Sequence, residues 1–182
     1  MVTAGRPVGR RWRRFAVPGL VLVAAAGFVF ALTTGSGPAA QRAPHFSFPR
    51  LGGGSAVAYP LTGADAHRAV VLSFFASWCS PCRTELPTIA SVADHARTAS
   101  PRVVFVGIDG NDEPASGLAF ARKSGVTFAV GADADSALAP RLGLVGYPDT
   151  VFIDASGTVA GVVHGPVTRA VLQSWVARLS SA

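Results

Sequence analysis

The apolar run AVVLSFF at residues 69–75 leads within four residues to Cys79, the first of the two cysteines in the chain. A run of this kind predicts a strand that is buried on both faces of a sheet. From about Ser80 to Thr98 the apolar residues recur at helical spacing, which predicts a helix. A buried strand that leads through a Cys-x-x-Cys pair into a helix favours an α/β fold in which the two elements pack together.

Strand and helix patterns alternate along the rest of the chain. Further strands are expected at 45–48, 55–59, 102–109 and 126–130, and a hairpin at 149–163. This order of elements predicts an α/β sandwich of three layers, with a mixed sheet that is parallel in one part and antiparallel at one edge.

Three more helices are expected from their capping residues. One starts at Asn111 or Asp112 and ends at Gly125, and a short one spans 135–143. Thr168 is expected to cap the last helix. The inward face of that helix is predicted to hold Val171, Leu172, Trp175, Val176 and Leu179.

The N-terminal end combines a basic flank with an apolar run. Five arginines precede residues 15–32, FAVPGLVLVAAAGFVFAL, which carry no charge. This pattern is typical of an export signal or a membrane anchor, and 18 residues are enough to cross a bilayer. We expect a basic N-region with an anchor or signal segment at 1–32, a flexible tether at 33–43 and one folded domain at 44–182.

The basic flank also predicts orientation. Arginines next to a membrane span stay on the cytoplasmic side, so the folded domain is expected outside the cytoplasm. We favour a single-pass protein of the cell membrane, and the alternative is a secreted protein cut near Ala39. Either location permits a disulfide.

The formal net charge of +6 comes mostly from the N-terminal end. From Thr33 onward the chain has 11 basic and 10 acidic residues, so the folded part is nearly neutral. The basic surface of a nucleic-acid-binding domain is therefore absent, and we expect no nucleic-acid partner.

The cysteine pair has three interpretations. As a structural staple it closes a loop of four residues, for which the gain in stability is small, roughly 2 kcal/mol. As a zinc site it lacks further clustered ligands, because His45, His67, His95 and His164 form no second motif. We expect these histidines at the surface or in ordinary packing, and we expect no metal and no cofactor.

The third interpretation is a reactive dithiol, and we favour it. Cys79 lies at the predicted start of a helix, where free N–H groups and the helix dipole stabilise an anion. The pKa of its thiol is therefore expected below the ordinary value. Cys82, one turn further on, is expected to be more buried, and Pro81 fits the first turn between them.

At these residues the chain resembles the thioredoxin superfamily. The segment VVLSFFASWCSPCRTELP is similar to its strand–WCxxC–helix signature, and four further features resemble the TlpA/ResA-type thiol-disulfide oxidoreductases of bacterial envelopes. These features are the N-terminal apolar segment, APHFSF at 43–48, an inserted strand–helix unit at 102–125 and GYPDTVFIDASG at 146–157. The resemblance covers about 43–180 and implies a thioredoxin-like fold with an extra N-terminal hairpin.

The resemblance implies roles for individual residues. Cys79 corresponds to the attacking thiol and Cys82 to the resolving one. Pro148 corresponds to a cis-proline that faces the disulfide, and Glu85 to a glutamate that handles protons at the buried thiol. The expected substrate-binding residues are Trp78, Pro81 and Tyr147.

Ser73 departs from the family pattern. Thioredoxins place a buried Asp six residues before the first cysteine, and many TlpA-type chains have Asn there. A serine cannot relay a proton as a carboxylate does, so proton transfer is expected to rely on Glu85 or water. Asp109, Asp112 and Glu113 are expected to be strand-end and helix-capping residues.

The function that the resemblance implies is thiol–disulfide exchange outside the cytoplasm. We favour a reductase of envelope proteins, with apocytochrome c as a candidate substrate, and we keep an oxidant of secreted proteins as an alternative. The expected partners are proteins with disulfides or dithiols and a membrane electron donor, and the chain is expected to be a monomer.

Two other functions remain as alternatives. A thiol peroxidase of the redoxin type needs Thr or Ser three residues before its reactive cysteine, and position 76 is Ala. A copper chaperone of this fold prefers CxxxC rather than the CxxC found here.

Overall fold

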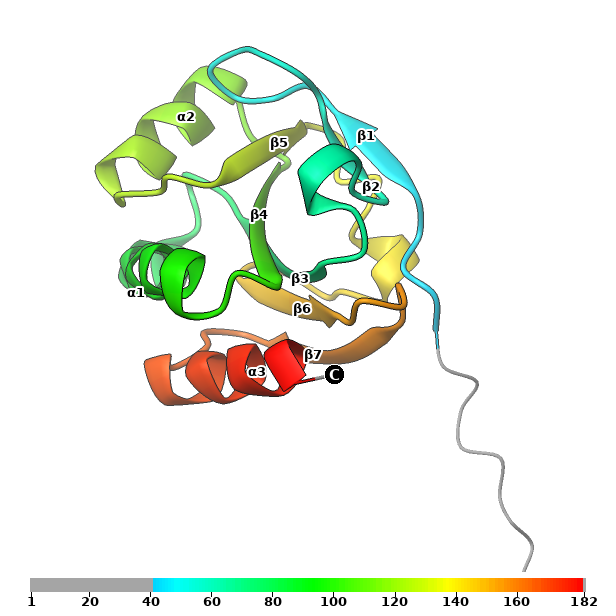
Figure 1. Cartoon of the computed structure of the whole chain (residues 1–182). Coiled ribbons are helices and arrows are strands. Elements are labelled where there is room, and N and C mark those ends of the chain that lie inside the picture. The colour runs from blue at the N-terminus through cyan, green and yellow to red at the C-terminus, as the bar shows by residue number, and fades with distance from the viewer. Residues whose placement is uncertain (1–40, 182) are drawn as a thin grey trace, which may run out of the picture. The chain divides into compact units, whose positions relative to one another are not determined.

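The structure, a computed structural model, describes residues 41–181 (Figure 1). The apolar segment at 15–32 and nearly all of the tether predicted at 33–43 lie outside the described residues. Within residues 41–181, none of the helices is both long and apolar enough to pass through a bilayer.

A five-stranded sheet forms the centre of the described part. Its strands are β3 (Ala69–Phe75), β4 (Val103–Gly110), β5 (Ala129–Asp133), β6 (Asp149–Ile153) and β7 (Val159–His164), in the order β5-β4-β3-β6-β7. Strands β3, β4 and β5 are parallel, whereas β6 and β7 are antiparallel to their neighbours. All seven residues of β3 are buried, as its apolar run predicts for the central strand.

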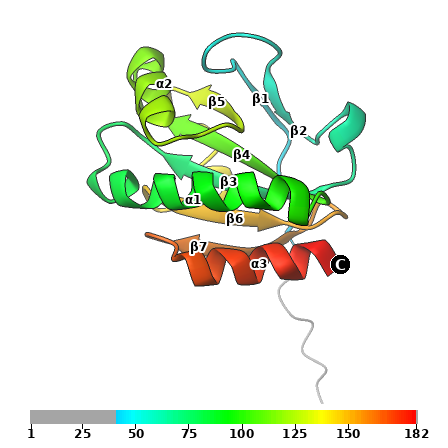
Figure 2. The same cartoon turned by 60° about the vertical axis from the view of Figure 1, so that its left-hand side comes forward.

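Three helices cover one face of this sheet, and a hairpin covers the other (Figures 1 and 2). The helices are α1 (Ser80–Ala99), α2 (Pro114–Lys123) and α3 (Arg169–Ser181). The hairpin joins β1 (Phe46–Phe48) to β2 (Val57–Tyr59), and two short 3-10 helices, η1 (Gly63–Asp65) and η2 (Pro140–Leu142), accompany it. The predicted thioredoxin-like α/β fold with a mixed sheet and an N-terminal hairpin is confirmed.

The alternation of side chains along β3 divides the core between these layers. Val71 packs with α1 and α3, whereas Val70, Leu72 and Phe74 pack under the hairpin. At the end of β3, Phe75 belongs to a third cluster that contains both cysteines and Ala121 of α2. The Cys-x-x-Cys pair that follows β3 therefore lies in apolar surroundings.

The prediction of a strand at 126–130 was wrong by three residues, because β5 is Ala129–Asp133. Val126 is used to close the preceding helix, since its N–H donates to the carbonyl of Ala121 at 3.0 Å. Gly125 takes the left-handed backbone conformation, with φ of 76°, that commonly ends a helix.

The helix predicted at 135–143 is reduced to η2. Asp133, at the end of β5, accepts hydrogen bonds from the N–H groups of Ala137 and Leu138 at 2.9 and 3.0 Å. A side chain that captures backbone donors in this way competes with a regular helix. Gly143 ends the segment as predicted, with φ of 70°.

Two predictions about helix ends and faces were also wrong. The N-cap position of α2 is held by Glu113, which was one of the expected capping residues, and not by Asn111 or Asp112; its side chain makes no capping hydrogen bond. Val171 is exposed rather than directed inward, although Leu172, Val176 and Leu179 of the same helix are buried. Thr168 does cap α3, because its hydroxyl accepts the N–H of Val171 at 3.3 Å.

Candidate active site

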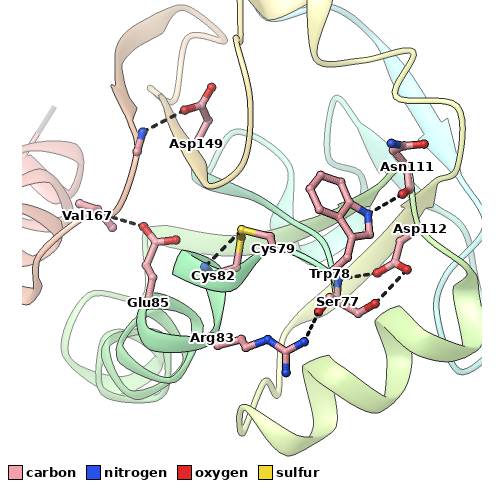
Figure 3. Close-up of a disulfide and its surroundings, with 11 residues drawn as sticks. Ser77, Trp78, Cys79, Cys82, Arg83, Glu85, Asn111, Asp112, Asp149 and Val167 are labelled. Atoms are coloured by element: carbon pink, nitrogen blue, oxygen red, sulfur yellow. Dashed lines mark hydrogen bonds between the residues drawn. A yellow bond between two sulfur atoms is a disulfide. The ribbon is translucent and has the colours of Figure 1, made fainter.

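Cys79 and Cys82 form a disulfide at the start of α1 (Figure 3). Cys79 is the N-cap residue, and its sulfur accepts the N–H of Cys82 at 3.2 Å. Pro81 lies in the first turn, where its missing N–H costs nothing. Cys79 keeps 3% of its surface exposed and Cys82 none, so Cys79 is the sulfur that a partner can approach.

Trp78 and Tyr147 lie beside the disulfide on separate segments. Trp78 is 55% exposed, and its ring meets that of Tyr147 edge to face, with 5.6 Å between centroids. The peptide bond from Tyr147 to Pro148 is cis, as the resemblance implied. The pair offers an aromatic surface next to the one sulfur that a partner can reach.

The loop between β4 and α2, residues 111–113, holds the turn that precedes Cys79 (Figure 3). Asp112 accepts the backbone N–H of Ser77 and, at 2.9 Å, its hydroxyl. The indole N–H of Trp78 donates to the carbonyl of Asn111 at 2.7 Å. Asp112 was predicted to be a capping residue; its carboxylate accepts the N–H of Glu113 at 2.8 Å and also holds the active-site turn, which was not predicted.

Arg83 contributes to the same turn from α1. Its guanidinium donates to the carbonyl of Ser77 at 3.0 Å. Ser77, Arg83, Asn111 and Asp112 were all missed as site residues. Asp112 lies 35 residues from Ser77, so local spacing gives no signal of this contact.

Glu85 lies one turn after Cys82, on the buried side of α1. Its side chain is 4% exposed, and one oxygen accepts the N–H of Val167 at 2.6 Å. Burial raises the pKa of this carboxyl to about 7, and the charge of Asp149 adds to the rise. A carboxyl that titrates near neutrality and lies one helical turn from the buried Cys82 can take up or release a proton in this part of the site.

Ser73 lies under α1 and is paired with Thr150 of β6. Both hydroxyls are buried, and within residues 41–181 neither has a hydrogen-bond partner. Position 73 thus carries no carboxylate. On α1, Glu85 is the carboxyl nearest to Cys82 in the sequence.

The other polar predictions have mixed outcomes. All four histidines are exposed, as expected for surface residues, and His164 contacts the buried Asp149 at 3.2 Å. Within the described residues, no group of three metal-ligating side chains comes together. Asp109 does lie near the end of a strand, but it is fully buried, which the sequence did not indicate.

A Cys-x-x-Cys disulfide at the start of a helix, after a central buried strand and with a cis-proline in a nearby loop, defines a thioredoxin-like protein. More narrowly, residues 39–162 match the AhpC/TSA family, and the chain belongs to that family.

Individual relatives agree with this assignment. The chain is 28% identical over 116 residues to the thiol:disulfide interchange protein HelX of Rhodobacter capsulatus, covering 62% of each chain. It is 27% identical over 109 residues to the thiol-disulfide oxidoreductase ResA of Bacillus subtilis, covering 60% of each. The predicted resemblance to ResA-type proteins is thereby confirmed.

A solved structure extends the match. The thiol:disulfide interchange protein of the thioredoxin family from Chlorobium tepidum TLS is similar with a TM-score of 0.66 and 29% identity. That match covers 79% of this chain and 98% of the other. The chain spans only about 60% of the length of the curated relatives it matches.

Proposed function

We propose that this protein is a thiol-disulfide oxidoreductase that acts on other proteins. The observation that carries the proposal is the position of Cys79, which caps α1 and is the more exposed sulfur of the pair. In the reduced protein the helix N-terminus and the N–H of Cys82 favour the thiolate of Cys79.

The proposed reaction has two exchanges. The Cys79 thiolate attacks a partner disulfide, a mixed disulfide forms and the second partner sulfur leaves as a thiolate. Cys82 then attacks the sulfur of Cys79, and the partner leaves with both of its sulfurs reduced. Two electrons pass from the cysteine pair to the partner, and Glu85 is placed to accept the proton that Cys82 gives up.

The favoured direction is reduction of disulfides in envelope proteins, including apocytochrome c. Support comes from the similarity to HelX and ResA, whose names describe thiol:disulfide interchange and oxidoreduction. A disulfide-forming oxidant is the alternative. Titration of the pair against glutathione decides between them, since a potential above about −150 mV is typical of an oxidant and contradicts the reductase.

The substrate is proposed to dock as an extended segment against Trp78, Tyr147 and Pro148. The exposed indole and the phenol offer a flat apolar surface with polar edges, which suits many sequences. The electron donor is proposed to be a thiol relay in the membrane, and the protein is proposed to act as a monomer.

We also propose that residues 15–32 anchor the protein in the cell membrane with its folded part outside the cytoplasm. The five preceding arginines and the uncharged 18-residue run support this orientation. If the segment is instead cut, the protein will appear in the culture medium rather than in the membrane fraction.

Trapping of partners tests the proposed activity. Cys82→Ser cannot complete the second exchange, so we expect mixed disulfides between Cys79 and partner proteins to accumulate in cells. Cys79→Ser is the matched control and is expected to trap none. Equal trapping by both variants, or by neither, contradicts the proposed roles, and rapid turnover of peroxide by the purified wild type would support the peroxidase instead.

A further inference from the structure

Asp109 is a buried acid that the proposed reaction does not use. It lies at the end of β4, only 1% exposed, beside Phe75 of β3. Within residues 41–181 neither carboxyl oxygen makes a hydrogen bond of regular geometry and the side chain takes part in no ion pair, although the carboxyl of Asp112 lies close enough to share a proton with it. An ionised carboxylate at such a place costs folding free energy, because no regular hydrogen bond replaces those that it loses to water.

The surroundings of Asp109 are built to hold it. On α2 the facing residue is Gly117, where an added Cβ would lie 1.8 Å from a carboxyl oxygen of Asp109. Only glycine permits the helix to approach this closely. β4 and α2 together form the space that the side chain of Asp109 occupies. The acid therefore lies in a closely packed part of the protein and not at its surface.

The groups around Asp109 keep it uncharged at neutral pH. Burial raises the pKa of its carboxyl to about 8, and the negative charge of Asp112 in the next loop adds to the rise. Tyr147 faces it from the loop before β6, and Asp133 and Asp149 act on that phenol as further negative charges. Phe75 from β3 and Gly117 from α2 bring no charge, and among the described residues no cation pairs with Asp109.

Three sets of contacts, made by residues next to Asp109, link it to the surroundings of the disulfide. Phe75, its neighbour in the sheet, belongs to the apolar cluster that contains both cysteines. The hydroxyl of Tyr147 packs against Gly110, the next residue along β4. Residues 111–113, which follow directly, hold Ser77 and Trp78 through Asp112 and Asn111.

We propose that Asp109 is a positioning residue for exchange at Cys79: as the uncharged acid it lets residues 111–113 hold Ser77 and Trp78, and its ionisation weakens these hydrogen bonds. The charge that appears at Asp109 repels the carboxylate of Asp112 and draws in water. It also repels an incoming thiolate at Cys79. The effect on exchange rests on the proposed function, whereas the effect on Trp78 does not.

The indole N–H of Trp78 provides the first test. Its NMR signal is followed from pH 6 to 9.5 in the oxidised full-length protein in mild detergent. We expect a shift with a midpoint near 8 in the wild type, the same shift in Glu85→Gln, and none in Asp109→Asn. Asp94→Asn, which removes an exposed acid on α1, is the matched control and is expected to keep the shift.

The second test measures reduction of the Cys79–Cys82 disulfide by glutathione. The ratio of the Asp109→Asn rate constant to the wild-type rate constant cancels the titration of glutathione itself. We expect this ratio to rise by about three- to tenfold between pH 6.5 and 9. A change of this size corresponds to the weakening of about one hydrogen bond. For Asp94→Asn the ratio is expected to stay constant.

The outcomes separate this inference from the proposed function. If Trp78 does not titrate near pH 8, or titrates unchanged in Asp109→Asn, the inference is overturned even when exchange activity is normal. If Trp78 behaves as expected but Cys82→Ser traps no partner, the proposed function fails alone. Should Asp109→Asn not fold, the carboxyl carbon signal of Asp109 in the wild type must share its midpoint with Trp78, and different midpoints refute the inference.

Discussion

Two buried acids, Glu85 on α1 and Asp109 at the end of β4, are held differently. Glu85 has a backbone donor in Val167, which partly offsets its burial, whereas Asp109 has no such donor within the described residues. Both retain their protons well above the pKa of an ordinary carboxyl. The unfolded chain loses these protons near the ordinary value, so both acids weaken the fold as the pH rises from about 4.5 towards neutrality and beyond.

Glu85→Gln tests this at the residue scale. The amide oxygen can still accept the N–H of Val167, but the side chain cannot ionise. The wild type loses stability between pH 4.5 and about 7, so at pH 8 we expect the oxidised variant to be more stable by on the order of 2 kcal/mol. Urea unfolding at pH 4.5 and 8 measures the difference, and an equal pH dependence in both proteins would disprove it.

At the scale of elements, the approach of α2 to β4 decides how the active-site turn is held. Gly117 lets α2 pack directly on Asp109, and the loop at 111–113, which leads from β4 into α2, binds Ser77 and Trp78. Glycine in a helix normally costs about 1 kcal/mol relative to alanine, so its presence here indicates a packing requirement.

Gly117→Ala is therefore expected to destabilise the protein by about 1–3 kcal/mol rather than stabilise it, because the methyl group overlaps the carboxyl of Asp109. The double variant with Asp109→Ala makes room and is expected to recover much of the loss. Ser116→Ala, one residue earlier on the exposed side, serves as the control. Denaturant unfolding of the wild type, Gly117→Ala, Asp109→Ala and the double variant gives the coupling, and additive effects would exclude the proposed contact.

At the scale of the whole molecule, the hairpin is part of the fold and not an appendage. Phe46, Phe48 and Val57 belong to the cluster that covers Phe74 and Ile108 of the sheet. Backbone bonds also tie the start of the described chain to the turn after β6, since Ala43 donates to the carbonyl of Gly157 at 3.0 Å. The face that helices leave uncovered is closed by this segment.

Truncation tests the role of the hairpin. A chain of residues 41–182 keeps β1, β2 and their bonds, and we expect it to unfold at the same urea concentration as the full-length protein. A chain of residues 62–182 exposes the face under the hairpin and is expected to lose cooperative unfolding and to bind the dye ANS. Cooperative unfolding of the shorter chain would show that the hairpin is dispensable.

The sequence by itself determined the features that depend on neighbouring residues. The apolar run at 69–75 predicted β3, the spacing after Cys79 predicted α1, and the hairpins followed from alternation around turns. Cys79 as helix cap was predictable because a cap and its helix are adjacent in the chain.

Only the tertiary structure decided which acids enter the core and which hold the active-site turn. Asp109 and Asp112 look like ordinary strand-end residues in the sequence. One is buried against Gly117, and the other binds Ser77 across 35 residues. The bounds of β5 were likewise determined by its pairing with β4 and not by its own apolar run. Periodicity records how a residue relates to its near neighbours, whereas burial and long-range hydrogen bonds depend on elements that meet only in the folded chain.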